Sequence, residues 1–291
     1  MTSIALPFER TDEGRAARRR VRKRVASVGL TALTYMLALA LFFPIFWTVL
    51  TGFKTEGAAV AQPPKLFFHA TLANYSEVLN SGYWSYFWNS ASISVGATLV
   101  ALVLGLPAAF SLAFYPTKRS PQVLSWVLST RMLPVVGALI PLIIISKRAH
   151  LFDTRQGMVL IYGAVNVPLV IWMMRSFFAE MPRDILEASL VDGASFLQLM
   201  RRILLPLSLP GLASTILLCL IFTWNEFLLA VNLTASRAST LPVFISGFQT
   251  SEGLFWAKMS AASTLAVAPV IIAGWIAQRS LVRGLTFGAV K

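Results

Sequence analysis

The stretch EASLVDGASFLQLMRRILLP, from Glu187 to Pro206, interrupts a chain that is otherwise rich in apolar residues. It gathers carboxylates, arginines and a central glycine, Gly193, and its charges are costly to place in the hydrocarbon of a membrane. Glycine at that position permits a sharp turn, because it adopts positive φ without steric cost. The apolar residues after the turn recur at spacings of three and four, as on one face of a helix: Phe196, Leu199, Met200 and Ile203. The stretch therefore predicts helix, turn and helix outside the membrane interior.

The ends of this segment are also marked in the sequence. Asp184 can serve as a helix N-cap with Glu187 three residues on, which would complete a capping box. Pro206 limits the second helix, because proline lacks a backbone N–H. Two interpretations stay open: an interfacial helix with its arginines at the lipid headgroups, and a docking element whose apolar stripe fills a groove on a partner protein.

Composition places the rest of the chain in a membrane. Of the 291 residues, 56% are hydrophobic and 13% are charged, and the mean hydropathy is +0.70. Soluble domains carry about 25% charged residues, so this composition is typical of an all-α, polytopic membrane protein. The net charge of +13 does not indicate nucleic-acid binding, because apolar blocks separate the basic residues and no continuous basic stripe forms.

Six apolar segments are long enough to span a bilayer, which takes roughly 20 residues. They are Ser27–Leu50, Asn89–Tyr115, Gln122–Ser146, Gly157–Met174, Leu207–Asn232 and Met259–Leu281. The first is longer than the apolar core of a signal peptide, which has roughly 7–15 residues, and we expect it to be retained as a helix. Six spans place both termini on one side of the membrane.

The basic residues predict which side that is. If both termini are cytoplasmic, the cytoplasmic segments hold 17 Lys and Arg and the opposite segments hold seven. Cytoplasmic loops carry an excess of these residues, so we expect cytoplasmic termini and a cytoplasmic Glu187–Pro206. The long outer loop, residues 51–88, is rich in aromatic residues, which fits either an interfacial belt or a docking surface for an external partner.

Sequence patterns for catalysis and for resident cofactors are absent. The chain has no phosphate-binding loop of the Gly-x-x-x-x-Gly-Lys-Ser/Thr type, no His-Glu-x-x-His pattern and no Gly-x-Ser-x-Gly elbow. Its single cysteine, Cys219, lies in an apolar run, and His69 and His150 stand alone. We therefore expect no catalytic residue, no metal site and no cofactor in this chain, which is typical of a conduit rather than an enzyme.

Polar and aromatic residues inside the predicted spans mark a candidate solute path, because polar groups there tend to face the interior of a bundle. They are Arg131, Asn166, Trp172, Trp224, Asn225 and Glu226. A structural interpretation stays open beside this one, in which Arg131 and Glu226 pair or satisfy kinked backbone near Pro134.

A resemblance to a known family favours the docking interpretation. Glu187-Ala188-Ser189, followed at fixed spacings by Gly193, Ile203 and Leu205-Pro206, resembles the EAA loop of ABC-importer permease subunits, which usually have alanine in place of Ser189. In that family the loop is a coupling helix that docks into a cleft on a separate ATPase subunit, and Glu187 would pair with a basic group there. The resemblance assigns this role to Glu187, Ala188, Ser189, Asp192, Gly193, Phe196, Met200, Arg201, Ile203, Leu205 and Pro206.

The likeness runs along nearly the whole chain and narrows to the second of two paired permeases in maltose-type carbohydrate importers. The segments that carry it are Phe53-Lys54-Thr55-Glu56, Asn74-Tyr75, Asn89-Ser90, Trp224-Asn225-Glu226, Thr240-Leu241-Pro242-Val243 and Ala261-Ala262. The pattern Arg131-Met132-Leu133-Pro134 resembles permeases for polyols. The tail that would reach the ATPase subunits contains Gly284, Leu285, Thr286, Gly288 and Lys291.

The resemblance implies a type I ABC importer permease, embedded in the lipid of the bacterial cytoplasmic (inner) membrane. It would move a sugar or polyol delivered by an external solute-binding protein, beside a second homologous permease and two ATPase subunits that hold ATP and Mg²⁺. The implied organisation is a basic segment at residues 1–26, a transmembrane domain at 27–283 with a coupling loop at 177–206, and a tail at 284–291. An ABC permease for a non-sugar solute stays open as an alternative. A secondary transporter also stays open, although no internal repeat of the kind many of them carry is evident.

Overall fold

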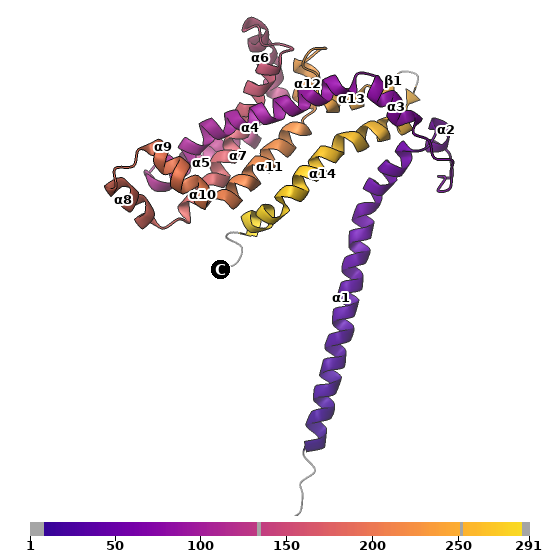
Figure 1. The fold of residues 1–291 in the computed structure, drawn as a ribbon, viewed down its shortest axis with the longest axis horizontal. Coiled ribbons are helices and arrows are strands. Elements are labelled where there is room, and N and C mark those ends of the chain that lie inside the picture. Colours follow the sequence, from indigo (N-terminus) through magenta and orange to yellow (C-terminus); the bar gives the residue numbers. More distant parts are fainter. Residues whose placement is uncertain (1–8, 133–134, 251–252, 287–291) are drawn as a thin grey trace, which may run out of the picture. The chain divides into compact units, whose positions relative to one another are not determined.

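The computed structural model describes residues 9–132, 135–250 and 253–286, and helices dominate these ranges (Figure 1). Some expected features fall outside them: residues 1–8 of the basic segment, Leu133 and Pro134 of the polyol-like pattern, and Gly288 and Lys291 of the tail. The chain divides into two compact units, residues 1–51 and residues 52–291, and each is described by itself.

The first unit is formed by one long helix. This helix, α1, runs from Glu9 to Gly52, so the described part of the basic segment is continuous with the first predicted span. Its apolar part, Ala26–Gly52, has a mean hydropathy of 2.0 and is long enough to cross a membrane. The predicted span Ser27–Leu50 lies inside it.

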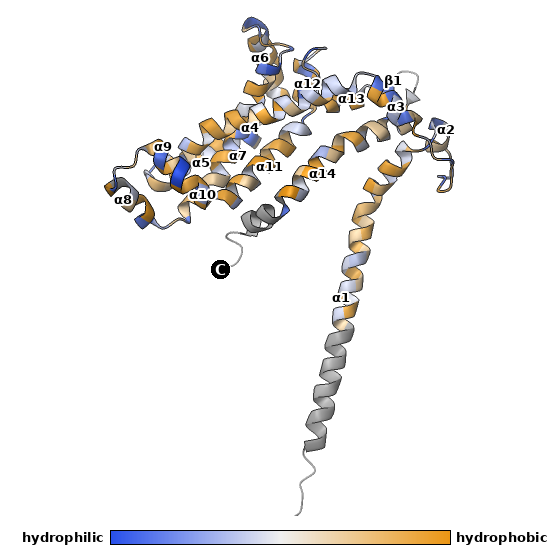
Figure 2. Cartoon of the chain, in the orientation of Figure 1, coloured by the Kyte–Doolittle hydropathy of each residue, from blue (hydrophilic) through white to orange (hydrophobic). Residues whose placement is uncertain are grey.

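Three helices of the second unit are also long and apolar enough to cross a membrane. They are α4 (Tyr83–Phe114), α7 (Arg155–Ala179) and the part Trp256–Ile276 of α14 (Trp256–Thr286). Apolar residues cover much of these helices in Figure 2. Pro107, Pro168 and Pro269 lie within them, and the helices continue through all three.

Two further candidate spans are bent pairs of helices. α5 (Ser120–Met132) and α6 (Val135–Arg148) meet at 87°, and the segment Phe196–Leu207 meets α11 (Leu209–Trp224) at 88°. Within the described ranges the chain therefore has four helices that could cross a membrane, or up to six if each bent pair is one span.

The predicted fifth span, Leu207–Asn232, is too long. α11 ends at Trp224, and a separate short helix, α12 (Leu228–Leu233), follows after three residues. The break has a local cause, because the Glu226 carboxylate accepts the backbone N–H groups of Leu229 and Ala230 and so starts a new helix. A hydropathy window averages over these polar residues and misses the break.

The helices of the second unit pack closely where glycines replace larger side chains. A Cβ atom on Gly105 of α4 would lie 2.6 Å from a methyl group of Val170 in α7, and one on Gly163 of α7 would lie 2.7 Å from a methyl group of Val100. Small residues at such contacts let two helix backbones approach, which is how membrane helices commonly associate. α11 packs on α4, α7 and α14, which completes the bundle.

Short elements cover the end of the bundle where α4 begins, here called the α3 end. They are α2 (Glu56–Ala59), α3 (Ala73–Asn80), α13 (Leu241–Ser246) and an antiparallel pair of strands, β1 (Gln249–Thr250) and β2 (Gly253–Leu254). The Asn74 side chain donates to the carbonyl groups of Gly52 and Lys54 at 2.9 and 2.7 Å. Glu56 accepts the N–H groups of Ala257 and Lys258, both at 3.0 Å, and so caps α14.

Candidate functional site

The segment Glu187–Pro206 forms the predicted helix, turn and helix at the opposite end, here called the α8 end. It comprises part of α8 (Arg183–Val191), α9 (Phe196–Leu199), the π-helix η1 (Met200–Leu204) and part of α10 (Leu205–Leu207). Gly193 has a φ of +72°, and the Ala194 N–H donates to the Ser189 carbonyl at 3.0 Å. This is the hydrogen bond of a Schellman motif with glycine in the left-handed position. The predicted turn at Gly193 is confirmed.

The predicted capping of this segment was wrong. α8 begins at Arg183, so Asp184 lies inside the first turn and is not the N-cap. The capping box lies instead after the turn, between Ser195 and Gln198: the Gln198 N–H donates to the Ser195 hydroxyl at 3.4 Å, and the Ser195 N–H donates to the Gln198 side chain at 2.9 Å. The pattern Ser-x-x-Gln that begins two residues after Gly193 is a signal that could have found it.

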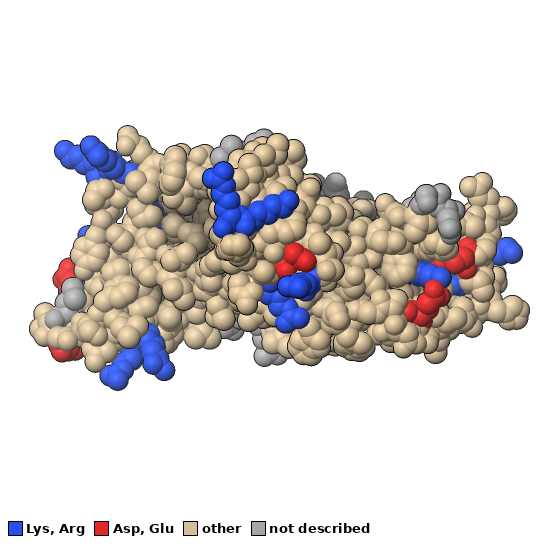
Figure 3. All heavy atoms as spheres, turned by 90° about the horizontal axis from the view of Figure 1, so that it is seen from above, with Lys and Arg blue, Asp and Glu red and all other residues tan. Residues whose placement is uncertain are grey.

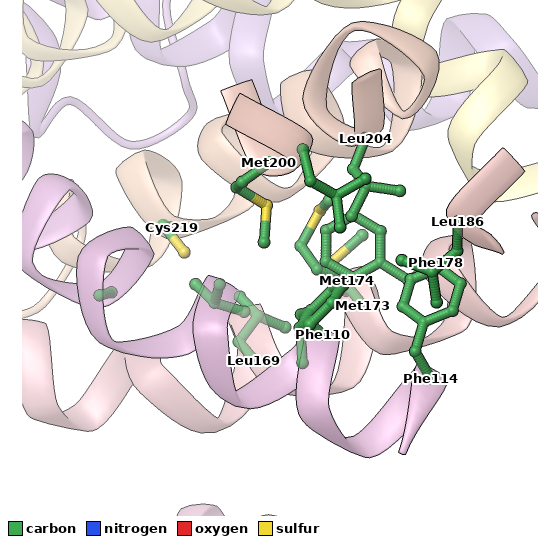
Figure 4. Close-up of a cluster of buried hydrophobic side chains, with 14 residues drawn as sticks. Phe110, Phe114, Leu169, Met173, Met174, Phe178, Leu186, Met200, Leu204 and Cys219 are labelled. Atoms are coloured by element: carbon green, nitrogen blue, oxygen red, sulfur yellow. The ribbon is translucent and has the colours of Figure 1, made fainter. Parts of the chain in front are cut away.

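The apolar stripe of this segment packs on the protein's own core. Leu199, Met200 and Leu204 are 2%, 6% and 1% exposed, and they share one cluster with residues of α4 and α7. Figure 4 shows Met200 and Leu204 beside Met174. The expectation that this stripe fills a partner's groove was therefore wrong, because its central side chains are already buried.

Residues at the edge of the stripe also contact the core cluster. The Phe196 ring contacts that of Phe110 edge-on, with 5.1 Å between their centres. Ile203 is half-buried against the same cluster. Ser189 is 5% exposed, and its hydroxyl donates to the Leu186 carbonyl at 2.7 Å. Ser189 and Ile203 therefore belong to the inner face of the segment, and Phe196, which is 48% exposed, lies at its edge.

The outer face of the segment carries both apolar and charged side chains, and we call it the α8 ridge. Its exposed members are Glu187, Ala188, Val191, Asp192, Leu197, Arg201 and Arg202. Val191 is 87% exposed and Leu197 is 69% exposed. Figure 3 shows that charged side chains gather in a few small groups on an otherwise uncharged face of the molecule. An apolar ridge with charges at its sides is suited to a protein partner.

Two of the predicted solute-path residues line one cavity. It has a volume of about 650 Å³ and lies between α11, α13 and α14. Trp224 and Asn225 form part of its wall, together with Phe227, Ser246, Gln249, Met259 and Ser263. The Trp224 indole N–H donates to the Ala266 carbonyl at 3.1 Å, and the Asn225 amide donates to the Ile221 carbonyl at 2.8 Å. No charged side chain lies among the described lining residues.

Two other predicted residues hold the bundle together around this cavity. Glu226 accepts a hydrogen bond of 2.6 Å from the Tyr162 hydroxyl of α7, besides the N–H groups at the start of α12. Asn166 of α7 is 3% exposed and donates to the Thr223 hydroxyl at 2.8 Å. Both side chains therefore connect α7 with the chain near the end of α11.

Arg131 and Trp172 lie apart from the cavity. The Arg131 guanidinium lies over the Phe222 ring, 4.5 Å from its centre, and one of its nitrogens is buried without a hydrogen-bond partner among the described residues. The Arg131–Glu226 pairing that one interpretation left open is not among the ion pairs of the described residues, and Glu226 accepts a hydrogen bond from Tyr162. Trp172 is 49% exposed. Among the described residues, no three His, Cys, Asp or Glu side chains lie close enough to hold a metal ion.

A further anchor at the α3 end was not predicted. Asp153 precedes α7 with a φ of +54°, and its carboxylate accepts backbone N–H groups of Ala235, Ser236, Arg237 and Ala238 at 2.9 to 3.2 Å. Partial burial acts to raise the Asp153 pKa, but the four donors outweigh it and hold the pKa below its ordinary value. Sequence alone gives no signal for this contact, because the partners are backbone groups of a distant loop.

Comparisons with known proteins agree with this architecture. The family described as binding-protein-dependent transport system inner membrane component matches residues 101–287. A probable ABC transporter permease protein of Sinorhizobium fredii is 38% identical over 88% of this chain and 92% of its own length. The diacetylchitobiose uptake system permease protein of Streptomyces coelicolor is 33% identical over 88% of this chain and 94% of its own length.

A solved structure has the same fold. The crystal structure of a bacterial ABC transporter involved in the import of the acidic polysaccharide alginate contains a chain that aligns with a TM-score of 0.71 and 22% identity. The alignment covers 89% of this chain and 97% of that chain. The family match includes the whole α8 ridge and the Trp224–Asn225 cavity wall. The chain therefore belongs to the binding-protein-dependent transport system inner membrane components, the ABC permease family, and is an integral protein of the inner membrane.

Proposed function

We propose that this chain is a permease subunit of an ATP-driven importer that moves a carbohydrate, delivered by an external solute-binding protein, into the cytoplasm. The observation that carries the proposal is the α8 ridge, an exposed surface whose inner side is buried in the same core as α4 and α7. Similarity to a permease named for diacetylchitobiose uptake, and to a transporter named for alginate import, supports a carbohydrate as the solute. The subunit itself carries no catalytic step in this proposal, since ATP and Mg²⁺ are held by partner ATPase subunits.

The proposal includes an orientation. The bent pair α5–α6 counts as one span and α11 counts as another, with the segment before it outside the membrane, which gives six spans and places both termini in the cytoplasm. The excess of Lys and Arg on that side supports this direction. The organisation is then a basic segment at residues 1–26, a transmembrane domain at 27–283 and a tail at 284–291 that reaches the ATPase subunits. Gly284, Leu285 and Thr286 of this tail form the end of α14.

Coupling to ATP hydrolysis needs a rigid connection between the ridge and the spans. Leu186, Leu199, Met200 and Leu204 supply it, because they are buried in one cluster with α4 and α7. A close-packed interior transmits displacement instead of absorbing it. In this proposal Glu187 pairs with a basic group of an ATPase subunit, and Val191 and Leu197 enter its cleft. A second homologous permease completes the transmembrane pathway.

The proposed solute path passes the cavity lined by Trp224 and Asn225. An indole ring can stack on the apolar C–H face of a sugar, and amide and hydroxyl groups can bond to its hydroxyls. Asn225, Gln249, Ser246 and Ser263 provide those groups. Glu226 and Asn166 support the walls of the path, because their side chains already bond within the chain.

The proposal is tested by charge reversal on the ridge. The Glu187→Lys variant, expressed with its partner subunits, should fail to recruit the ATPase subunits or should hydrolyse ATP without solute uptake. Glu180→Lys is the matched control, since Glu180 is an exposed carboxylate just after α7 and outside the ridge. Normal ATPase recruitment and normal uptake in Glu187→Lys would refute the docking role.

A further inference from the structure

A second cavity lies at the α8 end, outside the proposed solute path. It has a volume of about 440 Å³ and is bounded by the end of α4, the loop that leads into α5, and α7. One part of its wall is apolar and includes Leu112 and Leu124. The other part is polar and includes Thr117, Ser120, Ser125 and Arg175. A wall divided in this way suits a ligand that is itself amphiphilic.

Arg175 is the charged group of this cavity. It lies one turn before the end of α7 and is partly buried. Within the described part of the chain, its guanidinium has neither a carboxylate nor a hydrogen-bond partner. A guanidinium has five N–H donors and stays charged at all physiological pH values, so that of Arg175 is available to bond an anion that enters the cavity.

The loop beside Arg175 adds further donors and positive charge. The Ser120 hydroxyl accepts the Thr117 N–H at 2.8 Å and lies 3.2 Å from the Thr117 hydroxyl, which holds both side chains at the start of α5. Lys118 and Arg119 are exposed in the same loop. Hydroxyl groups and three basic side chains together favour an anion.

The position of the cavity identifies the source of that anion. α4 and α7 are both long and apolar enough to cross the membrane, and the cavity lies where α4 ends and α7 approaches its end. Tyr115 and Trp126, on either side of this loop, are 55% and 68% exposed. Tyr and Trp are enriched at the depth of the lipid headgroups. The cavity therefore opens at the depth of the headgroups.

We propose that this cavity binds one anionic phospholipid, whose phosphate lies against Arg175. Thr117, Ser120 and Ser125 donate hydrogen bonds to its headgroup oxygens. Leu112 and Leu124 contact the start of its acyl chains. Lys118 and Arg119 attract the anionic headgroup through their charge. Binding would hold α5 to α7 at the end of the bundle that carries the α8 ridge.

The experiment uses the complete transporter, purified with its partner subunits and reconstituted in nanodiscs. The lipid is phosphatidylcholine with or without phosphatidylglycerol, and retained lipid is identified by native mass spectrometry after release into mild detergent. We expect phosphatidylglycerol to remain bound and Arg175→Gln to lower its apparent affinity at least about fivefold, the change expected for one basic group at an anionic surface. Arg175→Lys keeps the positive charge but loses the planar guanidinium that can bond a phosphate through two N–H groups, so it should retain part of the binding.

Controls separate this site from general attraction of anionic lipid. Arg148→Gln removes an exposed arginine at the end of α6, outside the cavity, and should leave binding unchanged. Glycerol 3-phosphate, which lacks acyl chains, should not compete. Equal retention of phosphatidylglycerol and phosphatidylcholine, or equal loss in Arg148→Gln and Arg175→Gln, would overturn the proposal. So would a crosslink from position 175 to the second permease in place of lipid, because a carboxylate of that subunit would then be the partner of Arg175.

Discussion

The Tyr162 hydroxyl of α7 donates a hydrogen bond of 2.6 Å to Glu226, whose carboxylate also accepts N–H groups in the first turn of α12. Tyr162 is 2% exposed, so this bond lies within the bundle and fixes the break between α11 and α12. The same break places Trp224 and Asn225 in the wall of the 650 Å³ cavity. Glu226, a candidate for solute contact, is thus bonded within the chain, whereas its neighbours Trp224 and Asn225 line the cavity.

The Tyr162→Phe variant should destabilise the transporter, because it leaves a carboxylate oxygen without its hydroxyl donor. Hydrogen bonds to charged groups contribute about 1.5–3 kcal/mol. The thermal unfolding midpoint of the purified complex should fall, and solute transport should fall with it. Tyr115→Phe removes an exposed hydroxyl at the end of α4 and serves as the control. An unchanged midpoint for Tyr162→Phe would show that the Glu226 bond contributes nothing.

Substitutions at Gly193 should follow backbone preference and not side-chain size. A Cβ atom at Gly193 would meet nothing within 4 Å, so the cost of a side chain comes from the φ of +72° alone. Asn enters the left-handed region most readily, Ala at a cost of roughly 1–2 kcal/mol, and Pro cannot adopt it. Recruitment of the ATPase subunits should therefore decrease in the order Gly193→Asn, Gly193→Ala, Gly193→Pro. Equal recruitment in all three variants would show that docking does not depend on the left-handed turn at Gly193.

Asp153 should make the protein sensitive to acid. Because its folded pKa lies below the ordinary value of 3.8, its contribution to stability is fully present above that value. The contribution is lost as the pH falls from there through the lower folded-state pKa. Asp153→Asn should be less stable than the parent protein at neutral pH and should lose less stability on acidification. Tryptophan fluorescence during acid titration measures both, with Asp184→Asn as the control at the other end of the bundle.

Asn225 should contribute to solute affinity where a similar asparagine does not. Asn225 and Asn232 both donate to the carbonyl group four residues earlier, at 2.8 and 2.7 Å, but only Asn225 is among the described residues lining the cavity. Asn225→Ala should raise the KM for transport about two- to tenfold, the effect of one hydrogen bond. Asn232→Ala should leave KM unchanged. If both variants behave alike, the cavity is not on the solute path.

Local backbone chemistry was the part of the site that sequence could predict. The turn at Gly193 follows from what glycine permits, and the periodicity after it correctly identified Leu199 and Met200 as one apolar face. Periodicity could not say which surface that face meets, because the core it contacts comes from α4 and α7. The fold class followed from composition in the same way, since apolar runs of this length form helices in a membrane.

Long-range contacts explain what the sequence did not predict. The predicted fifth span ran through Glu226. The hydrogen bond that holds Glu226 comes from Tyr162, 64 residues away in the chain, and therefore gives no signal in the local sequence. Asp153 binds backbone N–H groups 82 to 85 residues later, which carry no side-chain signature. The two cavities likewise depend on how helices pack.

Ser189 points into the bundle, and its hydroxyl is satisfied by the Leu186 carbonyl within the same helix. Serine in place of the family's usual alanine therefore leaves the exposed surface of the subunit unchanged, because the side chain is buried. In the proposed docking an ATPase subunit would contact the exposed residues Glu187, Ala188 and Val191, so exchange between serine and alanine at position 189 should not change its binding. We expect ATPase subunits to be interchangeable between homologous permeases that differ here, whereas a difference at Val191 should restrict such exchange.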